Sequence, residues 1–522
     1  MIDLDGIAVM ADAARVQARR RGGEVAFLCG DRATTFAEFD ALSSRVADRL
    51  ILEGMRPQER IAILSKNSDY FYELFFGAMK ARVVPTPVNF RLAAPEIAYI
   101  LKDSRAKLLF VGAEFVEMAQ KAIAGFDAPP KLIALEGGAP DWTQYLDWRS
   151  QGAAIDPMLP APEDDVVLQL YTSGTTGNPK GVELSNKNYV SFLRLAEGVK
   201  GFDYKPGDSV LNAMPLFHVA GTNVGFVSLA SGSRTVILRD LIPGTVLTLI
   251  GAEKINHAFF VPAVIMMLMQ APEMETADLS SMRGVGYGAS PISEDLLRRA
   301  RERFGCDFLQ FYGMTETNGA GTYLPPEDHD PAKNRLRSCG IAWPGVEVKV
   351  VDANFNETPA GEVGEVVIRA PIVMKGYYNK PEATAEAIHD GWMKTGDAAY
   401  RDQDGYFFIY DRVKDMIVTG GENVYPAEVE NAVFGHPDVA DVAVIGVPDD
   451  RWGECVKAIV VLKPGASPDA ESIIAYARER VANYKVPKSV DFIETIPRNA
   501  SGKILRRELR VPYWEGRQRM VG

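Results

Sequence analysis

A run rich in glycine and hydroxyl groups, Tyr171–Val182 (YTSGTTGNPKGV), constrains this chain more than any other segment. Its twelve residues include three glycines, four serine or threonine hydroxyls and one lysine. Glycine carries a large entropic cost inside helices and strands, so the run predicts a loop. Backbone N–H groups left accessible by glycine, hydroxyl donors and a lysine charge together suit an anion. We therefore predict that this loop binds a polyphosphate.

The residues around this loop indicate an α/β fold. The apolar run Val166–Tyr171 leads directly into it, and loops at strand ends are common phosphate sites in α/β proteins. The loop is not a Walker A motif, because no GxxxxGK[ST] pattern occurs. Other short apolar runs, such as Arg60–Leu64 and Lys107–Val111, alternate with helical patterns. This alternation favours layered α/β structure with largely parallel sheets.

The pattern changes twice towards the C-terminus. Strand alternation in Gly345–Asp352 and Gly364–Ala370 predicts an antiparallel β subdomain. Beyond Arg412, helical spacing in 427–434 and about 470–482 flanks the predicted strands Val439–Asp449 and Val456–Gly465. These elements predict a compact α+β unit of roughly 110 residues, a normal domain size, with its boundary near Lys414.

Length, charge and cysteine usage narrow the class of protein. A chain of 522 residues is too long for one hydrophobic core. Its 57 basic and 69 acidic side chains give a net charge of −12, which argues against nucleic acid as the main partner. The four cysteines form no CxxC pair, and the N-terminus lacks a signal pattern, so we expect a cytoplasmic protein. The most apolar stretch, Ala258–Met269, is too short to span a membrane and predicts a strand end followed by a buried helix.

Four further segments carry candidate chemistry. Gln310–Thr317 (QFYGMTET) offers an aromatic ring for a purine, the Thr315 hydroxyl, and the Glu316 carboxylate for Mg²⁺. Lys394–Asp397 (KTGD) supplies an aspartate of the kind that binds a ribose diol. Asp411–Glu430 adds Arg412 and a glycine pair, and Pro497–Leu509 places Lys503 after a loop of small residues.

Taken in this order, the five segments resemble the acyl-adenylate-forming (ANL) superfamily. Within it the chain is similar to the acyl-CoA synthetases, namely fatty acyl-CoA and 4-coumarate-CoA ligases, from about Thr34 to about Leu509. The resemblance implies a large N-terminal AMP-binding domain over residues 1–412, built of layered α/β sheets with a β-barrel-like subdomain. It also implies a small mobile α+β C-terminal domain over residues 413–522.

The resemblance implies an AMP-forming acid–thiol ligase with two half-reactions. A carboxylate first attacks the α-phosphorus of ATP, which gives acyl-AMP and pyrophosphate. The thiol of coenzyme A then attacks the acyl carbon, and AMP leaves. The implied partners are ATP, Mg²⁺, coenzyme A and a small carboxylic acid, while the oligomeric state, homodimer included, stays open.

Site residues follow from the resemblance by position. The implied ATP-binding residues are Thr172, Ser173, Gly174, Thr175, Thr176, Gly177, Lys180, Ala289, Ser290, Gln310, Phe311, Tyr312, Gly313, Met314, Thr315, Glu316, Asp397, Arg412 and Lys503. Thr172 and Glu316 are the implied Mg²⁺ ligands. The implied catalytic residues are Lys503, Thr176, Glu316 and His218. Lys414 falls at the family's hinge, and Gly420, Gly421 and Glu422 fall where the coenzyme A tunnel is lined.

Met214–Phe226 (MPLFHVAGTNVGF) resembles the segment that lines the acyl pocket. The implied pocket residues are His218, Val219, Ala220, Gly221, Asn223, Gly286 and Gly288, although a core histidine is an alternative for His218. The small residues Ala220, Gly221 and Gly225 predict space for a chain or ring, and Met266, Met267 and Met269 predict either an adaptable apolar wall or a plain core helix. The segment contains no Asp or Glu to pair an ammonium group, which favours a simple organic acid. We expect a medium- to long-chain fatty acid, with a hydroxycinnamate or benzoate as the rival.

Other functions are less consistent with the sequence. Gly284–Ala289 fits G-x-G-x-x-[GA], and Tyr410 with Lys414 forms a Y-x₃-K pair, as in dehydrogenases, but such isolated matches are weak. A luciferase-like oxygenase would share the adenylation motifs and stays open. A non-catalytic acyl-binding protein is disfavoured because the catalytic positions are intact. A serine hydrolase is disfavoured because no G-x-S-x-G elbow occurs.

Overall fold

The computed structural model describes residues 4–172, 179–290, 292–412, 415–419, 422–449, 451–498 and 504–515. Within these ranges the chain divides into two compact units. The larger unit comprises Met1–Val348 and Ile368–Met393, and the smaller one Lys349–Val367 and Lys394–Gly522. The predicted domain boundary near Lys414 stays a prediction, because positions 413 and 414 lie outside the described residues.

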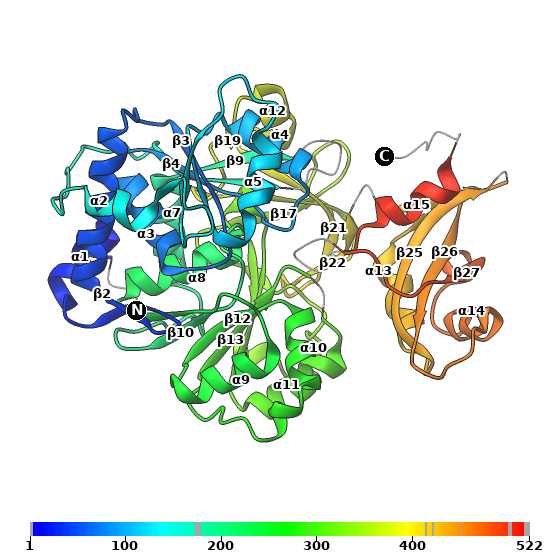
Figure 1. The fold of residues 1–522 in the computed structure, drawn as a ribbon. Helices are drawn as coiled ribbons and strands as arrows, with labels where there is room; N and C mark the ends of the chain where they lie inside the picture. Colours follow the sequence, from blue (N-terminus) through cyan, green and yellow to red (C-terminus); the bar gives the residue numbers. More distant parts are fainter. Residues whose placement is uncertain are drawn as a thin grey trace. The chain divides into compact units, whose positions relative to one another are not determined.

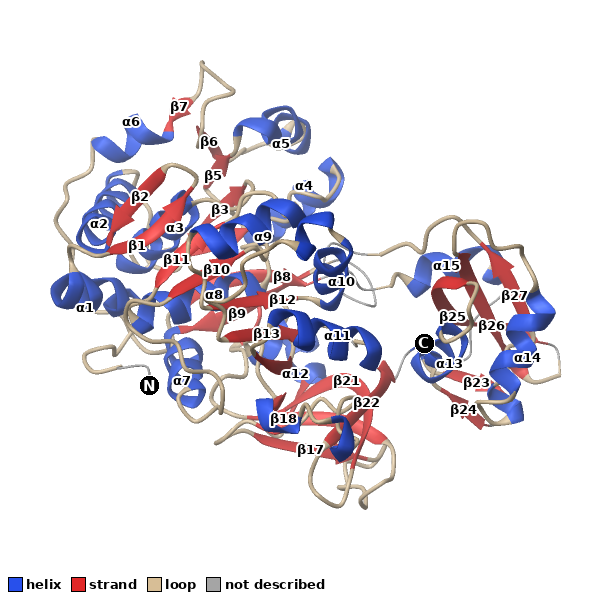
Figure 2. Cartoon of the chain, turned by 90° about the horizontal axis from the view of Figure 1, so that it is seen from below, coloured by secondary structure: helices blue, strands red, loops and turns tan. Residues whose placement is uncertain are grey.

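Two largely parallel sheets form the centre of the larger unit (Figures 1 and 2). Among the described residues, nine strands make the first sheet, and antiparallel neighbours occur only towards its ends. Its order is β16 (Ile341–Ala342), β15 (Thr322–Leu324), β14 (Asp307–Tyr312), β13 (Gly284–Gly288), β12 (His257–Phe260), β10 (Ser209–Asn212), β11 (Arg234–Ile237), β1 (Val25–Cys29) and β2 (Arg32–Thr35). The second, all-parallel sheet is β4 (Val84–Pro87), β3 (Arg60–Leu64), β5 (Leu108–Val111), β6 (Lys131–Ala134) and β7 (Thr143–Gln144).

The predicted α/β class is confirmed by this arrangement. A third, antiparallel sheet is formed by β19 (Gly376–Tyr377), β9 (Lys180–Ser185) and β8 (Val166–Thr172). Helices surround the sheets (Figure 1), and their starts follow local rules. Thr35, for example, begins α2 with a capping box, because its side chain accepts from the Glu38 amide and Glu38 accepts from the Thr35 amide. The helices of this unit are α1 (Ala11–Arg21), α2 (Phe36–Leu52), α3 (Asp69–Lys80), α4 (Ala94–Ser104), α5 (Val116–Ile123), α6 (Tyr145–Ser150), α7 (Asn186–Ala196), α8 (Val219–Ser231), α9 (Pro243–Ala252), α10 (Pro262–Gln270), α11 (Glu294–Phe304) and α12 (Pro381–Ala387).

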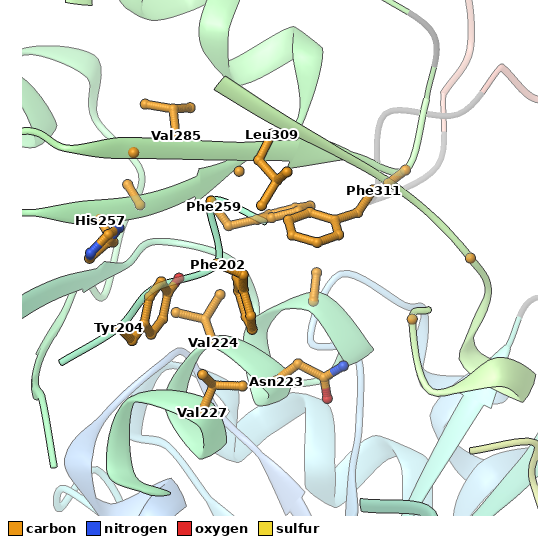
Figure 3. A pocket seen from close by; sticks show the side chains of 18 of the residues that line it. Phe202, Tyr204, Asn223, Val224, Val227, His257, Phe259, Val285, Leu309 and Phe311 are labelled. Atoms are coloured by element: carbon orange, nitrogen blue, oxygen red, sulfur yellow. The ribbon is translucent and has the colours of Figure 1, made fainter. Parts of the chain in front are cut away.

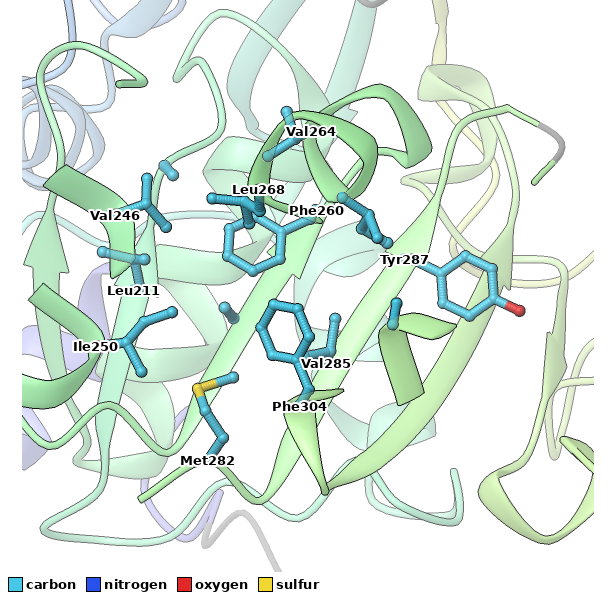
Figure 4. Close-up of a cluster of buried hydrophobic side chains, with 14 of the residues drawn as sticks. Leu211, Val246, Ile250, Phe260, Val264, Leu268, Met282, Val285, Tyr287 and Phe304 are labelled. Atoms are coloured by element: carbon cyan, nitrogen blue, oxygen red, sulfur yellow. The ribbon is translucent and has the colours of Figure 1, made fainter. Parts of the chain in front are cut away.

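The residues of β12, β13 and β14 alternate between two different environments. Side chains such as Phe260 and Tyr287 pack into a hydrophobic core with α9, α10 and α11 (Figure 4). The intervening positions, such as Phe259 and Gly286, line a cavity on the side of α8. Because side chains alternate across a strand, one face of the sheet stabilises the fold while the other is left to form a binding site.

The predicted antiparallel β subdomain is present as a fourth sheet, through which the division between the two units runs. Its strands are β17 (Glu347–Val351), β18 (Gly364–Arg369), β21 (Trp392–Arg401), β20 (Ile388–His389) and β22 (Phe407–Arg412). The remaining sheet belongs to the smaller unit and consists of β24 (Glu422–Val424), β23 (Ile417–Thr419), β26 (Gly453–Leu462), β25 (Val439–Asp449) and β27 (Ser489–Phe492). Helices α13 (Pro426–Phe434), α14 (Ala470–Arg478) and α15 (Arg506–Trp514) complete this α+β unit, as its sequence pattern predicts.

Candidate functional site

The glycine-rich loop closes a β-hairpin. Thr172, at the end of β8, pairs directly with Lys180, at the start of antiparallel β9. The predicted loop residues Ser173, Gly174, Thr175, Thr176 and Gly177 lie outside the described residues. Strand β9, rather than a helix, follows the loop, so no helix dipole points at it from that side.

The hairpin is fixed to the fold immediately before the loop. Tyr171 donates a hydrogen bond to Asp103 Oδ2 at 2.7 Å, and Lys380 pairs with Asp103 Oδ1 at 2.8 Å. Burial, followed by the hydrogen bond to Asp103, raises the pKa of Tyr171 well above its usual value, so the hydroxyl remains a donor. On β9, Glu183 accepts from Arg60 at 2.5 Å. The loop therefore starts and ends on strands that side chains hold in place.

The Gln310–Thr317 segment places its polar groups just beyond the end of a parallel strand. Strand β14 ends at Tyr312, and Gly313 then passes so close to Gly319 that a β carbon would lie 2.5 Å from the Gly319 carbonyl carbon. Only glycine fits such a backbone crossing. Residues Thr315–Thr317 form a short 3₁₀ turn in which Glu316 is buried. Ala289 and Ser290 follow the neighbouring strand β13, so both groups lie at one sheet edge, where α/β proteins bind ligands.

Tyr377 connects two of the predicted site residues. Its hydroxyl donates to Glu316 Oε1 at 2.8 Å, and Lys180 Nζ lies 4.9 Å from the centre of its ring. The Tyr377 side chain therefore contacts the Glu316 carboxylate through its hydroxyl and the Lys180 ammonium through the face of its ring. The arrangement brings the lysine of the glycine-rich hairpin to the same tyrosine as the carboxylate of Gln310–Thr317. The sequence gives no signal for Tyr377, which lies in MKGYYNKP, outside every recognised motif.

The oxygen donors of this part of the site suit Mg²⁺. Glu316 contributes a carboxylate and Thr172 a hydroxyl, and Mg²⁺ commonly combines one or two carboxylates with phosphate oxygens and water. Across the described residues, no group of three or more His, Cys, Asp or Glu side chains could hold a metal ion. This donor set fits a cation that reaches the protein together with a polyphosphate.

The smaller unit brings two predicted ribose ligands onto neighbouring strands. Asp397 on β21 pairs directly with Arg412 on β22, and the Asp397 side chain is buried. Glu422 begins β24. The predicted hinge Lys414, the tunnel glycines Gly420 and Gly421, and Lys503 lie outside the described residues, so their assignments stay predictions.

A mostly apolar cavity extends along β12, β13 and β14 on the side of α8 (Figure 3). Four of the predicted acyl-pocket residues line it, namely Val219, Ala220, Asn223 and Gly286. Phe311, Gly313 and Ala289, predicted as nucleotide contacts, also line it. Sequence reasoning missed its other walls, which are Phe192, Gly201, Phe202, Tyr204, Val224, Val227, His257, Ala258, Phe259, Gly284, Val285, Asp307, Leu309, Gly319 and Trp343.

One expectation about this cavity is wrong, and one pair of alternatives is resolved. Gly221 and Gly225 do not leave space in it, because β carbons there would lie 2.2 Å from the Pro215 carbonyl oxygen and 2.0 Å from the Tyr72 hydroxyl. Their small size lets α8 pack closely against its neighbours instead. Of the two alternatives for Met266, Met267 and Met269, the adaptable wall is not part of the lining. Helix α10 instead packs into the core through Val264, Ile265 and Leu268, while Met266 and Met267 are exposed.

We expect Gly225→Ala to destabilise the larger unit by about 1–3 kcal/mol, because the methyl group would overlap the buried ring of Tyr72. Tyr72 cannot easily move, since Asn212 Nδ2 donates to its hydroxyl at 2.6 Å. Thermal unfolding followed by circular dichroism measures the effect. The matched control is Gly125→Ala, whose β carbon would meet no atom within 4 Å. Equal melting temperatures for the two variants would contradict this packing role.

His218 lies at the N-terminal cap of α8, beside the cavity residues Val219 and Ala220. Its Nε2 atom is buried and has no hydrogen-bond partner among the described residues. Burial, with a smaller effect from Arg91, lowers the pKa of His218 to about 4. The imidazole is therefore neutral at pH 7, and its Nε2 atom is an uncharged polar group beside the cavity.

Because of this lowered pKa, His218 makes the folding stability of the protein sensitive to acid. The unfolded chain protonates His218 near its ordinary pKa of about 6.5, whereas the folded chain does so only near pH 4. Stability should therefore fall as pH decreases from 6.5 towards 4. We expect His218→Gln to lose less stability than the wild type across this range. Melting temperatures at pH 6.5 and 4.5 test this, and an unchanged pH dependence would contradict the assignment.

The glycines of Gly284–Ala289 are strand residues rather than a phosphate-binding turn. Strand β13 contains Gly284, Gly286 and Gly288, and a β carbon at Gly288 would lie 2.2 Å from the Phe311 carbonyl oxygen on the neighbouring strand. The three glycines thus keep the cavity face of β13 flat. The dinucleotide-binding alternative requires these glycines in a turn between strand and helix, so the structure argues against it. In the described parts of the chain, no helix is long and apolar enough to cross a membrane.

Two family models match this chain. The model of AMP-binding enzymes matches residues 14–378, and the model of the C-terminal domain of AMP-binding enzymes matches residues 428–503. The sequence is 40% identical over 499 residues to the fatty acid–[acyl-carrier-protein] ligase ScoC of Streptomyces coeruleorubidus, covering 95% of each chain. It is also 40% identical over 484 residues to a feruloyl-CoA synthase of an Amycolatopsis species, covering 92% of this chain and 94% of that one. The fold is similar to that of the anthranilate CoA ligase AuaEII in complex with anthranoyl-AMP, with a TM-score of 0.88, 28% identity and 97% of each chain covered.

Proposed function

The chain belongs to the family of AMP-binding enzymes and is an AMP-forming acid–thiol ligase, and on that premise we propose that it activates a carboxylic acid as an acyl-adenylate at the glycine-rich hairpin and transfers the acyl group to coenzyme A. The observation that carries this proposal is the meeting of Lys180 and Glu316 at Tyr377. Lys180 brings a positive charge from the hairpin, and Glu316 brings an acidic ligand from the neighbouring sheet edge. A triphosphate with its metal ion needs both groups close together.

In the first half-reaction, the hairpin holds the β- and γ-phosphates through Thr172, Lys180 and the residues between them. Glu316, with Thr172, would hold Mg²⁺, which supplies positive charge to the phosphate oxygens when it is bound. Tyr312 and the Ala289–Ser290 segment contact the adenine, while Asp397 and Arg412 bind the ribose. The acid's carboxylate oxygen attacks the α-phosphorus, the bond to the bridging oxygen breaks, and pyrophosphate leaves.

Lys503 aligns the two reactants in this step. A positive charge beside both the carboxylate and the α-phosphate reduces their mutual repulsion and keeps them in attack geometry. We propose that the smaller unit rotates about Lys414 before the second half-reaction. Lys503 then leaves, and the segment containing Gly420, Gly421 and Glu422 lines the path of coenzyme A, where glycine allows close backbone approach.

In the second half-reaction, the coenzyme A thiolate attacks the acyl carbon, and AMP leaves with the oxygen that came from the acid. The neutral His218 beside the cavity supports this step, because an uncharged ring can accept the thiol proton or pack against the reacting carbonyl. The free cysteines of the described residues, Cys29, Cys306, Cys339 and Cys455, support a reducing compartment, and we place the reaction in the cytoplasm.

The hydrocarbon part of the acid binds in the apolar cavity. A medium- to long-chain fatty acid and an aryl acid both have the required apolar surface. ScoC is named as a fatty acid ligase, and the Amycolatopsis relative as a feruloyl-CoA synthase, so relatives of equal identity support both classes. ScoC is also named for a carrier-protein acceptor, which makes a carrier thiol the alternative to free coenzyme A.

A pyrophosphate-release screen tests the proposal. Purified protein, ATP and Mg²⁺ are incubated with acids of graded chain length and aromaticity, with or without coenzyme A. We expect AMP, pyrophosphate and acyl-CoA in equal amounts for at least one class of acid. Oxygen uptake with light emission would favour the luciferase-like alternative. Absence of pyrophosphate release with every acid, with and without coenzyme A, would overturn the proposal.

A further inference from the structure

The cavity extends away from the proposed site of adenylation towards the starts of three strands. His257, Gly284 and Asp307 are the first residues of β12, β13 and β14, and they pair across the sheet in one row. Gly288 and Phe311 pair four residues further along, next to Ala289 and Gly313. At about 3.3 Å per residue, the two rows are about 13 Å apart. The row containing His257 is therefore the distal end of the cavity.

Several aromatic rings line the cavity. Phe202 and Trp343 both lie against Phe311, with ring centres 5.6 and 5.7 Å away, and Phe259 lies 6.3 Å from Phe311. Gly286 lies between Phe259 and Phe311, where a β carbon would come within 3.2 Å of both rings. Flat rings above a floor without side chains suit a planar aromatic group, because aromatic pairs gain energy beyond the area they bury.

Two buried polar side chains stand at the distal end (Figure 3). Tyr204 and His257 are only 5% and 3% exposed, and their ring centres lie 4.6 Å apart. Within the described ranges, no residue forms a hydrogen bond with the Tyr204 hydroxyl. Burial raises the pKa of Tyr204 well above its usual value, so this hydroxyl is protonated and can both donate and accept. Because Tyr204 lines the cavity, a ligand can supply the partner that this hydroxyl does not find in the described protein.

The neighbours of His257 determine which of its nitrogens faces the cavity. Arg283 Nη2 lies 2.8 Å and Asp208 Oδ2 3.4 Å from Nε2, so this nitrogen is engaged by side chains of the protein itself. Nδ1 faces the cavity, because a β carbon added to the lining residue Gly284 would lie 3.2 Å from it. His257 therefore presents a ring nitrogen, Nδ1, to the cavity next to the Tyr204 hydroxyl.

We propose that the preferred acid is aromatic and carries a hydroxyl group on the ring position farthest from its carboxylate. This inference rests on the proposed function and specifies its substrate class. The substrate hydroxyl forms one hydrogen bond with His257 Nδ1 and a second with the Tyr204 hydroxyl. The aromatic walls hold the ring, and the carboxylate reaches the site of adenylation. An alkyl chain would fill the same walls but leave both polar groups without a partner.

The test compares 4-hydroxycinnamate, cinnamate and octanoate as substrates, with acyl-CoA formation as the readout. In the wild type we expect kcat/KM for 4-hydroxycinnamate to exceed that for cinnamate by about 10- to 100-fold, and that for octanoate by at least as much. In Tyr204→Phe, which keeps the ring, the preference over cinnamate should fall towards one while the cinnamate rate is retained. The control is Tyr189→Phe, a buried tyrosine outside the cavity lining, which should keep the wild-type ratio.

The outcomes distinguish a failure of the assigned hydroxyl-binding end of the cavity from a failure of the ligase function. If acyl-CoA forms with octanoate or cinnamate as efficiently as with 4-hydroxycinnamate, or if Tyr204→Phe keeps the full preference, the assignment of the distal end is wrong while the ligase function stands. If no acid yields acyl-CoA, the proposed function itself fails. Loss of preference in Tyr189→Phe as well would show that the effect does not come from the distal pair, and would overturn the inference.

Discussion

Replacing Lys503 by alanine should slow the adenylation half-reaction by about 10²-fold or more, while thioester formation from preformed acyl-AMP stays close to the wild-type rate. One well-aimed catalytic charge typically contributes this much. The asymmetry arises because the lysine is needed only where the negative carboxylate approaches the negative α-phosphate. Once acyl-AMP exists, that repulsion is gone.

The residues on either side of Lys503 indicate that the substitution leaves the fold intact. Arg498 and Ile504 form an antiparallel bridge, and the Leu505 amide donates to the Pro497 carbonyl oxygen at 2.9 Å. Arg498 also pairs with Asp441 of β25 at 2.8 Å. These contacts fix the segment on both sides and do not involve the Lys503 side chain.

Two assays separate the half-reactions of this variant. Exchange of labelled pyrophosphate into ATP reports adenylation, and acyl-CoA formed from synthetic acyl-AMP reports thiol transfer. Lys488→Ala is the matched control, because Lys488 is an exposed lysine of the same unit and should leave both rates unchanged. Wild-type pyrophosphate exchange in Lys503→Ala, or equal loss in both assays, would refute the role assigned to this lysine.

Glu316→Gln should lower pyrophosphate release by about 10²- to 10³-fold and raise the Mg²⁺ concentration needed for half-maximal activity. The amide keeps the shape of the buried side chain but removes the negative charge that suits Mg²⁺. Tyr377→Phe should have a smaller effect, because it removes one hydrogen bond to Glu316 and keeps the ring beneath Lys180. Initial rates across a Mg²⁺ titration measure both variants.

The control for this series is Glu327→Gln, an exposed carboxylate paired with Lys200 at 2.9 Å. It should match the wild type at every Mg²⁺ concentration. If Glu316→Gln shows an unchanged Mg²⁺ requirement, then Glu316 does not hold the metal ion, and its burial beside Tyr377 serves only the fold.

Sequence patterns predicted the main elements where one physical rule dominated. Arg60–Leu64 forms β3, and Val439–Asp449 forms β25. In both, an apolar or alternating run is enough to indicate a strand. The strand predicted at Val456–Gly465 instead spans Gly453–Leu462, since Gly453, with φ of 79°, already ends the preceding turn. Boundaries of this kind depend on turn geometry, which hydrophobic periodicity does not encode.

The site was predicted less completely than the fold. The residues that were not predicted come together only through tertiary structure. Tyr377 reaches Glu316 only because β19 pairs with β9, a contact between segments almost 200 residues apart in sequence. The role of Gly225 was misread because the ring of Tyr72, which comes from a distant helix, occupies the space beside it. Tyr204 and His257 likewise meet only where a loop and a strand converge, so no local motif marks them.

The transfer of an oxygen atom from the acid to AMP tests the central claim most directly. A substrate acid labelled with ¹⁸O in both carboxylate oxygens is converted to acyl-CoA, and the products are examined by mass spectrometry. Attack of the carboxylate on the α-phosphorus predicts one ¹⁸O atom in each AMP and none in pyrophosphate. Unlabelled AMP, or label in pyrophosphate or inorganic phosphate, would contradict an acyl-adenylate intermediate.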